Sequence, residues 1–265
     1  MIPSSAVGRY RSELRKIVDT ASGSFKAALL EDLPRLSQMD PEELLEELVW
    51  ILRDYVMVYG DEAATLAADF YSELAEAAGV KVPDPTLYQW GNEEYYGFVQ
   101  RHMDDLAEGL VDKFVRGMQG VLSNMVKTSA NRTMGENAVV TNKVTGQRKP
   151  RRKGKPSGVR FARVPTGPTT CAFCIMLASR GFVYASRETA GQFEKYHDNC
   201  DCIVIPEFDN EGIEGYDPDV YLKQWYDADG DLKQLRRNLY PEQKDHINEV
   251  RRATYARNKA LEGGD

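Results

Sequence analysis

Apolar residues recur every three or four positions through the first half of the chain, the spacing of a helix that buries one face. Asp40 followed by Pro41 predicts a helix start, because Asp caps helices and Pro suits the first helical position. Gly60 is expected to end that helix, and Gly79 the next one. The pattern predicts helices over residues 4–20, 25–36, 41–59, 61–78 and 96–125.

The longest apolar stripe runs from Tyr96 to Met125. It fits one long helix, or two helices broken near Gly117 or Gly120, because glycine destabilises a helix interior by ~1 kcal/mol relative to alanine. The simplest interpretation of these stripes is the core of a helical bundle. We therefore expect a mainly α fold, with a helical N-terminal domain followed by a small α+β metal-knuckle domain.

The composition changes at about Asn131. Residues 131–170 are rich in Gly, Asn, Thr, Pro and basic residues, and apolar pattern survives only at Val139-Val140 and from Val159 to Phe161. This indicates a domain boundary, with an exposed basic loop between two short strands. The predicted division is a helical domain over 1–130, a basic loop or linker over 131–164, and a Cys/His knuckle domain with C-terminal helices over 165–265.

Within the C-terminal part, short apolar runs predict two further strands, Gly181 to Tyr184 and Cys202 to Pro206. Asp217-Pro218 predicts the start of a helix through Tyr226. Pro241 predicts the start of a last helix over about 242–261.

All four cysteines lie within residues 171–202. They form Cys171-x2-Cys174 and, with a histidine, His197-x2-Cys200-x-Cys202. Zinc takes four thiolate or imidazole ligands, and a Cys-x2-Cys turn presents two sulfurs to one ion. In a reducing cytosol such a cluster indicates a metal site before disulfides. We expect a structural zinc bound by Cys171, Cys174, Cys200 and Cys202, with His197 nearby or in place of one cysteine.

Charge is unevenly distributed along the chain. The net charge is −7, yet nine basic residues and no acid fall between Lys143 and Arg163, which leaves −16 on the remainder (−7 minus +9). Such a run is often simply solvated, but it also suits contact with DNA phosphates without sequence readout, or with an acidic partner. The candidate contact residues are Arg148, Lys149, Arg151, Arg152, Lys153 and Lys155.

Two stretches carry a resemblance to a known family: residues 165–184, PTGPTTCAFCIMLASRGFVY, and residues 196–202, YHDNCDC. They resemble the MuF-like minor head proteins of actinobacteriophages. The resemblance implies a protein made beside the portal and major capsid proteins that acts in procapsid assembly. It also implies portal, scaffold and major capsid proteins as partners, and a location in the virion head, with the host cytoplasm during assembly.

Proteins of this kind are often labelled capsid maturation proteases, which makes a peptidase the alternative. Cys171 or Cys174 with His197 would then form a thiolate–imidazole pair. A serine version would need Ser179 or Ser186 near a histidine, with an acid such as Asp198. His102 and His246 lie on predicted helices and are interpreted as packing or surface residues. Zinc would occupy the thiolates that catalysis needs, so we favour the structural role.

The N-terminal sequence lacks a basic stretch followed by an apolar one, and no run approaches the ~18 apolar residues of a membrane span. We therefore expect folding in a cytosol and no membrane partner.

Overall fold

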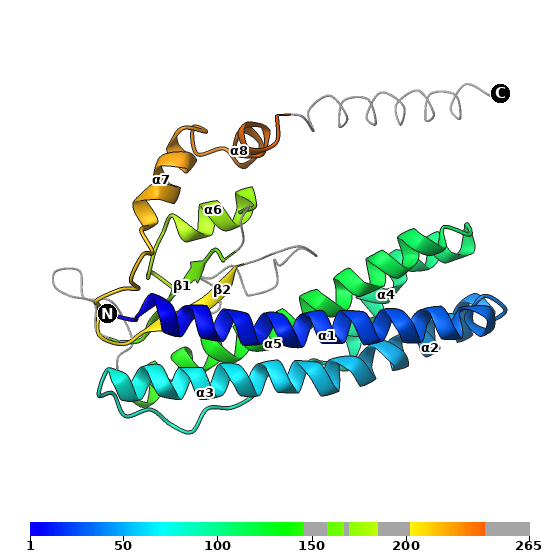
Figure 1. The fold of residues 1–265 in the computed structure, drawn as a ribbon, viewed down its shortest axis with the longest axis horizontal. Helices are drawn as coiled ribbons and strands as arrows, with labels where there is room; N and C mark the ends of the chain where they lie inside the picture. The colour runs from blue at the N-terminus through cyan, green and yellow to red at the C-terminus, as the bar shows by residue number, and fades with distance from the viewer. Residues whose placement is uncertain (146–157, 167–169, 185–201, 242–265) are drawn as a thin grey trace.

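The computed structural model describes residues 1–145, 158–166, 170–184 and 202–241. Within these ranges the fold is mainly α, as predicted, with a single two-stranded sheet (Figure 1). In chain order the elements are α1 (Ser4–Leu36), α2 (Pro41–Tyr55), the π-helix η1 (Val56–Gly60), α3 (Asp61–Ala77), α4 (Asn92–Ala107), α5 (Val111–Val144), β1 (Arg160–Val164), α6 (Ala172–Ala178), β2 (Ile203–Glu207), α7 (Pro218–Tyr226) and α8 (Leu232–Leu239).

The first two predicted helices are one continuous helix, α1. The buried stripe passes through Ala21 and Phe25 without a break, and Ser24 donates its hydroxyl to the carbonyl of Thr20 at 2.9 Å. Pro34 lies in the last turn and does not shorten the helix. Asp40 caps α2 as predicted, because its carboxylate accepts the backbone N–H groups of the first turn.

Gly60 does not end a helix, contrary to the prediction. Its φ of −69° and ψ of −39° are helical, and the chain continues through η1 into α3. The glycine is needed for packing instead, because a Cβ at this position would lie 3.0 Å from the hydroxyl oxygen of Ser129 on α5. Gly79, in contrast, follows the end of α3 with φ +66°, as predicted.

The break in the long apolar stripe lies at Gly109, with φ +75°, rather than at Gly117 or Gly120. Gly117 is inside α5, where a Cβ would overlap the imidazole ring of His102 on α4. This glycine therefore permits close approach of two helices and does not interrupt one. His102 is a packing residue, as expected.

Helix α5 continues to Val144, so residues 131–144 are neither a loop nor, at Val139-Val140, a strand. The prediction was wrong because the polar residues here are buried, which hides the apolar period. The predicted strands at 159–161 and 202–206 are confirmed as β1 and β2, which pair antiparallel with Arg160 opposite Glu207 and Val164 opposite Ile203. Gly181 to Tyr184 supplies only one bridge, from Tyr184 to Phe161.

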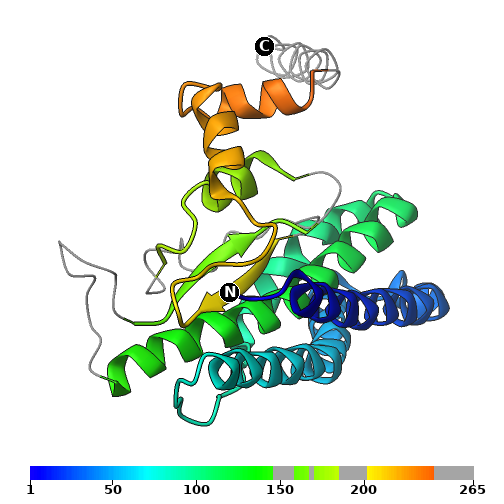
Figure 2. The same cartoon turned by 60° about the vertical axis from the view of Figure 1, so that its left-hand side comes forward.

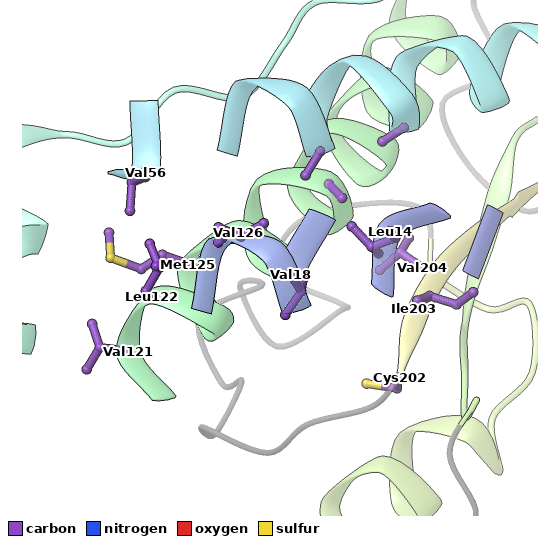
Figure 3. Packing of buried hydrophobic residues seen from close by; sticks show 14 of the residues in the cluster. Leu14, Val18, Val56, Val121, Leu122, Met125, Val126, Cys202, Ile203 and Val204 are labelled. Carbon is purple, nitrogen blue, oxygen red and sulfur yellow. The ribbon is translucent and has the colours of Figure 1, made fainter. Parts of the chain in front are cut away.

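The elements form two layers on either side of the antiparallel sheet of β1 and β2. Helices α1, α3 and α5 run side by side beneath it, and α6 to α8 lie on its other side (Figures 1 and 2). The strand β2 joins the helical core, since Val204 lies beside Leu14 of α1 (Figure 3). A second, small cluster joins α6 to α8 through Ala172, Ile175 and Leu235.

Helix α7 has the predicted bounds, whereas the helix predicted over 242–261 lies outside the described residues. The division into domains at 130 and 164 stays a prediction. No helix in the described ranges is long and apolar enough to cross a membrane.

Candidate functional site

The Cys-x2-Cys turn lies at the start of α6. Cys171 is the N-cap residue, with φ −68° and ψ 154°, and its sulfur accepts the backbone N–H of Cys174 at 3.3 Å. This geometry places Cys174 one turn into the helix, with its side chain buried. A backbone donor aimed at a sulfur stabilises the thiolate, which is the form that binds metals.

The structure brings this turn to the start of β2. The sulfur atoms of Cys174 and Cys202 are 3.1 Å apart, and both residues are buried. That separation exceeds the ~2.05 Å of a disulfide bond and is somewhat shorter than the ~3.7 Å that Zn–S bonds of ~2.3 Å imply. The structure therefore brings two of the four predicted thiols together, and the convergence of all four stays a prediction.

The remaining predicted donors, His197 and Cys200, lie outside the described residues. Among the residues that are described, no group of three or more His, Cys, Asp or Glu has a metal-binding arrangement. The four-thiolate zinc site thus stays a prediction. The six basic residues proposed to contact DNA or a partner, between Arg148 and Lys155, also lie outside the described ranges.

Arg163 is the residue of this site that the sequence did not reveal. It lies on β1, is 1% exposed, and donates from Nε and Nη2 to the sulfur of Cys202 at 3.1 and 2.7 Å. A buried guanidinium stays charged, so it favours negative charge on the sulfur it contacts. In the sequence Arg163 looked like one more member of the basic run. Its only signal was its position two residues after the apolar run from Val159 to Phe161.

Arg160, on the same strand, is also internal rather than part of a basic surface. Its Nη2 donates to Oε2 of Glu207 on the paired strand β2 at 2.7 Å. Burial nevertheless raises the pKa of Glu207, and the N–H of Gly212 and the charge of Arg160 only partly offset this. Two of the nine basic residues counted in the sequence therefore stabilise the sheet.

The strands β1 and β2 are held on α5 by side-chain amides, which bond to backbone groups of the strands. Asn142 exchanges two hydrogen bonds of 2.7 Å with the backbone N–H and C=O of Val159. Asn131 accepts the N–H of Val204 at 2.7 Å and donates to the carbonyl of Cys202 at 3.4 Å. These buried amides satisfy backbone groups that would otherwise be desolvated. They also fix the position of the strand that carries Cys202.

The same helix holds the segment between α3 and α4. Asn137 makes two 2.9 Å hydrogen bonds with the backbone of Thr86, and Thr133 accepts the N–H of Tyr88 at 3.0 Å. The guanidinium of Arg132 lies 4.5 Å from the ring centre of Tyr88 and 5.2 Å from that of Trp90. Residues 129–142 of α5 therefore form a buried polar segment, in which Asn131 and Asn142 hold the strands while Thr133 and Asn137, on another side of the helix, hold the segment before α4.

Of the serine-peptidase candidates, Ser179 is described. It is buried at the end of α6 and donates its hydroxyl to the carbonyl of Met176 at 2.8 Å. This is a local helix-end contact, which gives Ser179 a structural function. Ser186, Asp198 and His246 lie outside the described residues.

Comparison with known proteins places these features in a family context. The VG15 protein family matches residues 1–228, which include the buried polar segment of α5 and the thiol site. The Gene 15 protein of Mycobacterium phage D29 is 32% identical over 128 residues, covering 36% of this chain and 46% of the relative. The Gene 15 protein of Mycobacterium phage L5 is 33% identical over 112 residues, covering 28% and 38%. The chain thus spans less than half of these curated relatives, and no solved structure matches it.

Proposed function

Because the chain belongs to the VG15 protein family, with relatives in mycobacteriophages, we propose that it is a structural protein of the bacteriophage head. In this proposal it is a MuF-like minor capsid protein that acts in head morphogenesis beside the portal. Its partners are the portal, scaffold and major capsid proteins, and its location is the virion head. The resemblance of residues 165–184 and 196–202 to MuF-like proteins supports this assignment.

The observation that carries the structural role is the burial of two of the three described thiols, since Cys171 alone is partly exposed. Cys174 and Cys202 are enclosed between α6, β1 and β2, and the guanidinium of Arg163 is in contact with one of the two sulfurs. A peptidase nucleophile must reach the carbonyl carbon of a polypeptide. Cys174 and Cys202 instead lie where α6 packs on the two-stranded sheet. Thiols in this position suit a structural cross-link within a small unit.

A structural zinc fits the part of the site that is described. Cys174 and Cys202 are close enough to share one ion, and both Arg163 and the N-cap geometry stabilise thiolates. Cys171 and Cys200 would complete a four-thiolate ligand set. We expect one zinc per chain in reduced protein by elemental analysis. Cys174→Ser should expose residues 165–206 to proteolysis while α1 to α4 stay protected, and equal protection of both regions would contradict a zinc-dependent knuckle.

The peptidase remains the alternative for the same residues. Cys171 is partly exposed at the N-cap of α6, where a thiolate is stabilised, but His197, the base that a peptidase requires, lies outside the described residues. The two functions differ in what they require of His197. A four-thiolate structural site tolerates its loss, whereas a thiolate–imidazole peptidase does not.

Complementation of a phage that lacks this gene separates the two functions. We expect His197→Gln to support head assembly with unaltered electrophoretic sizes of scaffold and capsid proteins. Cys174→Ser should fail to assemble heads, because the knuckle does not fold. If His197→Gln is stably produced but leaves a head-protein precursor uncleaved, the structural proposal is wrong and the peptidase is right.

A further inference from the structure

An exposed apolar surface lies on the outer side of α2 and η1. Trp50 on α2 and Met57 and Val58 on η1 are 60%, 51% and 63% exposed, and the two elements form one continuous run of helix. The core residues of α2, such as Leu48 and Leu52, are buried on the opposite side. Trp and Met are enriched where proteins meet other proteins. We call Trp50, Met57 and Val58 the α2 face.

Acidic residues surround the α2 face. Helix α2 contains five acids and one base, Arg53, which gives a net charge of −4 (one minus five). Glu43, Glu46 and Asp54 are exposed on the same side as Trp50. The surface therefore suits an occupant that is apolar on one side and carries positive charge beside it.

The chain itself contains a segment of this chemistry. Residues 250–261, VRRATYARNKAL, include Val250, Leu261 and four basic residues, with no acid. They lie outside the described residues, within the helix that the sequence predicts over 242–261. In a helix, Val250 and Leu261 would lie on the same side, since eleven residues are close to three full turns.

We propose that residues 250–261 of a second copy of the chain dock on the α2 face. The described chain leads toward this segment from α8, which packs on α6. Helix α2 instead packs on α1, α4 and η1, and Figures 1 and 2 show α2 and α8 well apart. A contact between two copies joins these regions without requiring the segment to cross its own molecule, and it links successive copies in an assembly.

The test is the self-association of the full-length chain, measured by sedimentation velocity over a range of concentrations. We expect Trp50→Ala, and separately Arg251→Glu with Arg252→Glu, to weaken association at least about tenfold, as for an interface hot spot. Tyr226→Ala is the matched control, because Tyr226 is an exposed aromatic residue on α7, and it should leave association unchanged.

Mixing the two defective variants identifies the contact. The Trp50→Ala chain keeps the basic segment, and the doubly substituted chain keeps the α2 face, so the mixture should associate more strongly than either variant alone. A wild-type chain that stays monomeric throughout would overturn the proposal, as would an association that neither variant weakens. Failure of the mixture to associate would also overturn it, without affecting the proposed role in the head.

Discussion

The buried polar segment of α5 allows a quantitative prediction of how much stability the substitution Asn142→Ala removes. The substitution removes two hydrogen bonds of 2.7 Å and leaves the buried N–H and C=O of Val159 without the partner they have in the native chain. Each unsatisfied backbone group costs ~1–3 kcal/mol, and the better helix propensity of alanine returns at most ~0.7 kcal/mol. For the two groups together the expected loss is therefore about 1–5 kcal/mol, a large part of the ~5–15 kcal/mol that stabilises a typical domain.

Urea unfolding followed by circular dichroism measures this loss. At an m value of about 3 kcal/mol per molar urea, the midpoint should fall by about 1 M. Val140→Ala is the control, because Val140 is exposed on the same helix two residues away, and it should change the midpoint little. If the unfolding free energies of the Asn142→Ala and Val140→Ala variants differ by less than about 0.5 kcal/mol, the amide of Asn142 does not hold β1 on α5.

Three further predictions concern packing, pH and salt. Gly117→Ala should destabilise the chain by ~1–3 kcal/mol in urea unfolding, because its Cβ overlaps His102, and His102→Ala in the same chain should recover part of that loss. Burial raises the pKa of Glu207, so its protonation favours the folded state below the ordinary carboxyl pKa, and this benefit is lost as the pH rises through the raised pKa. As the pH falls from neutral, the unfolding free energy of the wild type should therefore rise relative to that of the Glu207→Gln variant. A change of opposite sign would refute the raised pKa of Glu207. If the basic segment binds duplex DNA, log–log salt plots should have a slope of about −5 for five or six phosphate contacts. Replacing five residues of the segment with serine should remove most of that slope; the residues are Arg148, Lys149, Arg151, Arg152 and Lys153. Binding that persists unchanged in this variant would exclude the segment as the DNA contact.

The elements that the sequence predicted well are those with local signals. Asp40-Pro41 and Asp217-Pro218 start helices because their capping contacts lie within a few residues. The convergence of Cys174 with Cys202 was also predictable, since four clustered cysteines have few structural interpretations. The helix ends predicted at Gly60 and near Gly117 were wrong, because a glycine that permits close helix packing has the same sequence signature as one that ends a helix.

The polar half of α5 could not be predicted from periodicity. Asn131, Asn137 and Asn142 are buried because extended segments distant in sequence supply their hydrogen-bond partners. The same reasoning applies to Arg163, whose partner Cys202 is 39 residues away. Patterns of apolar residues identify a core that excludes water, whereas buried polar contacts depend on which segments meet in the fold.

The proposed role in the phage head is tested most directly by quantitative mass spectrometry of purified procapsids and virions. The account predicts this chain in both particles at a reproducible ratio to the portal protein, with residues 165–206 present and uncleaved. Absence of the chain from both particles, while it accumulates in the infected cell, would contradict a structural role in the head.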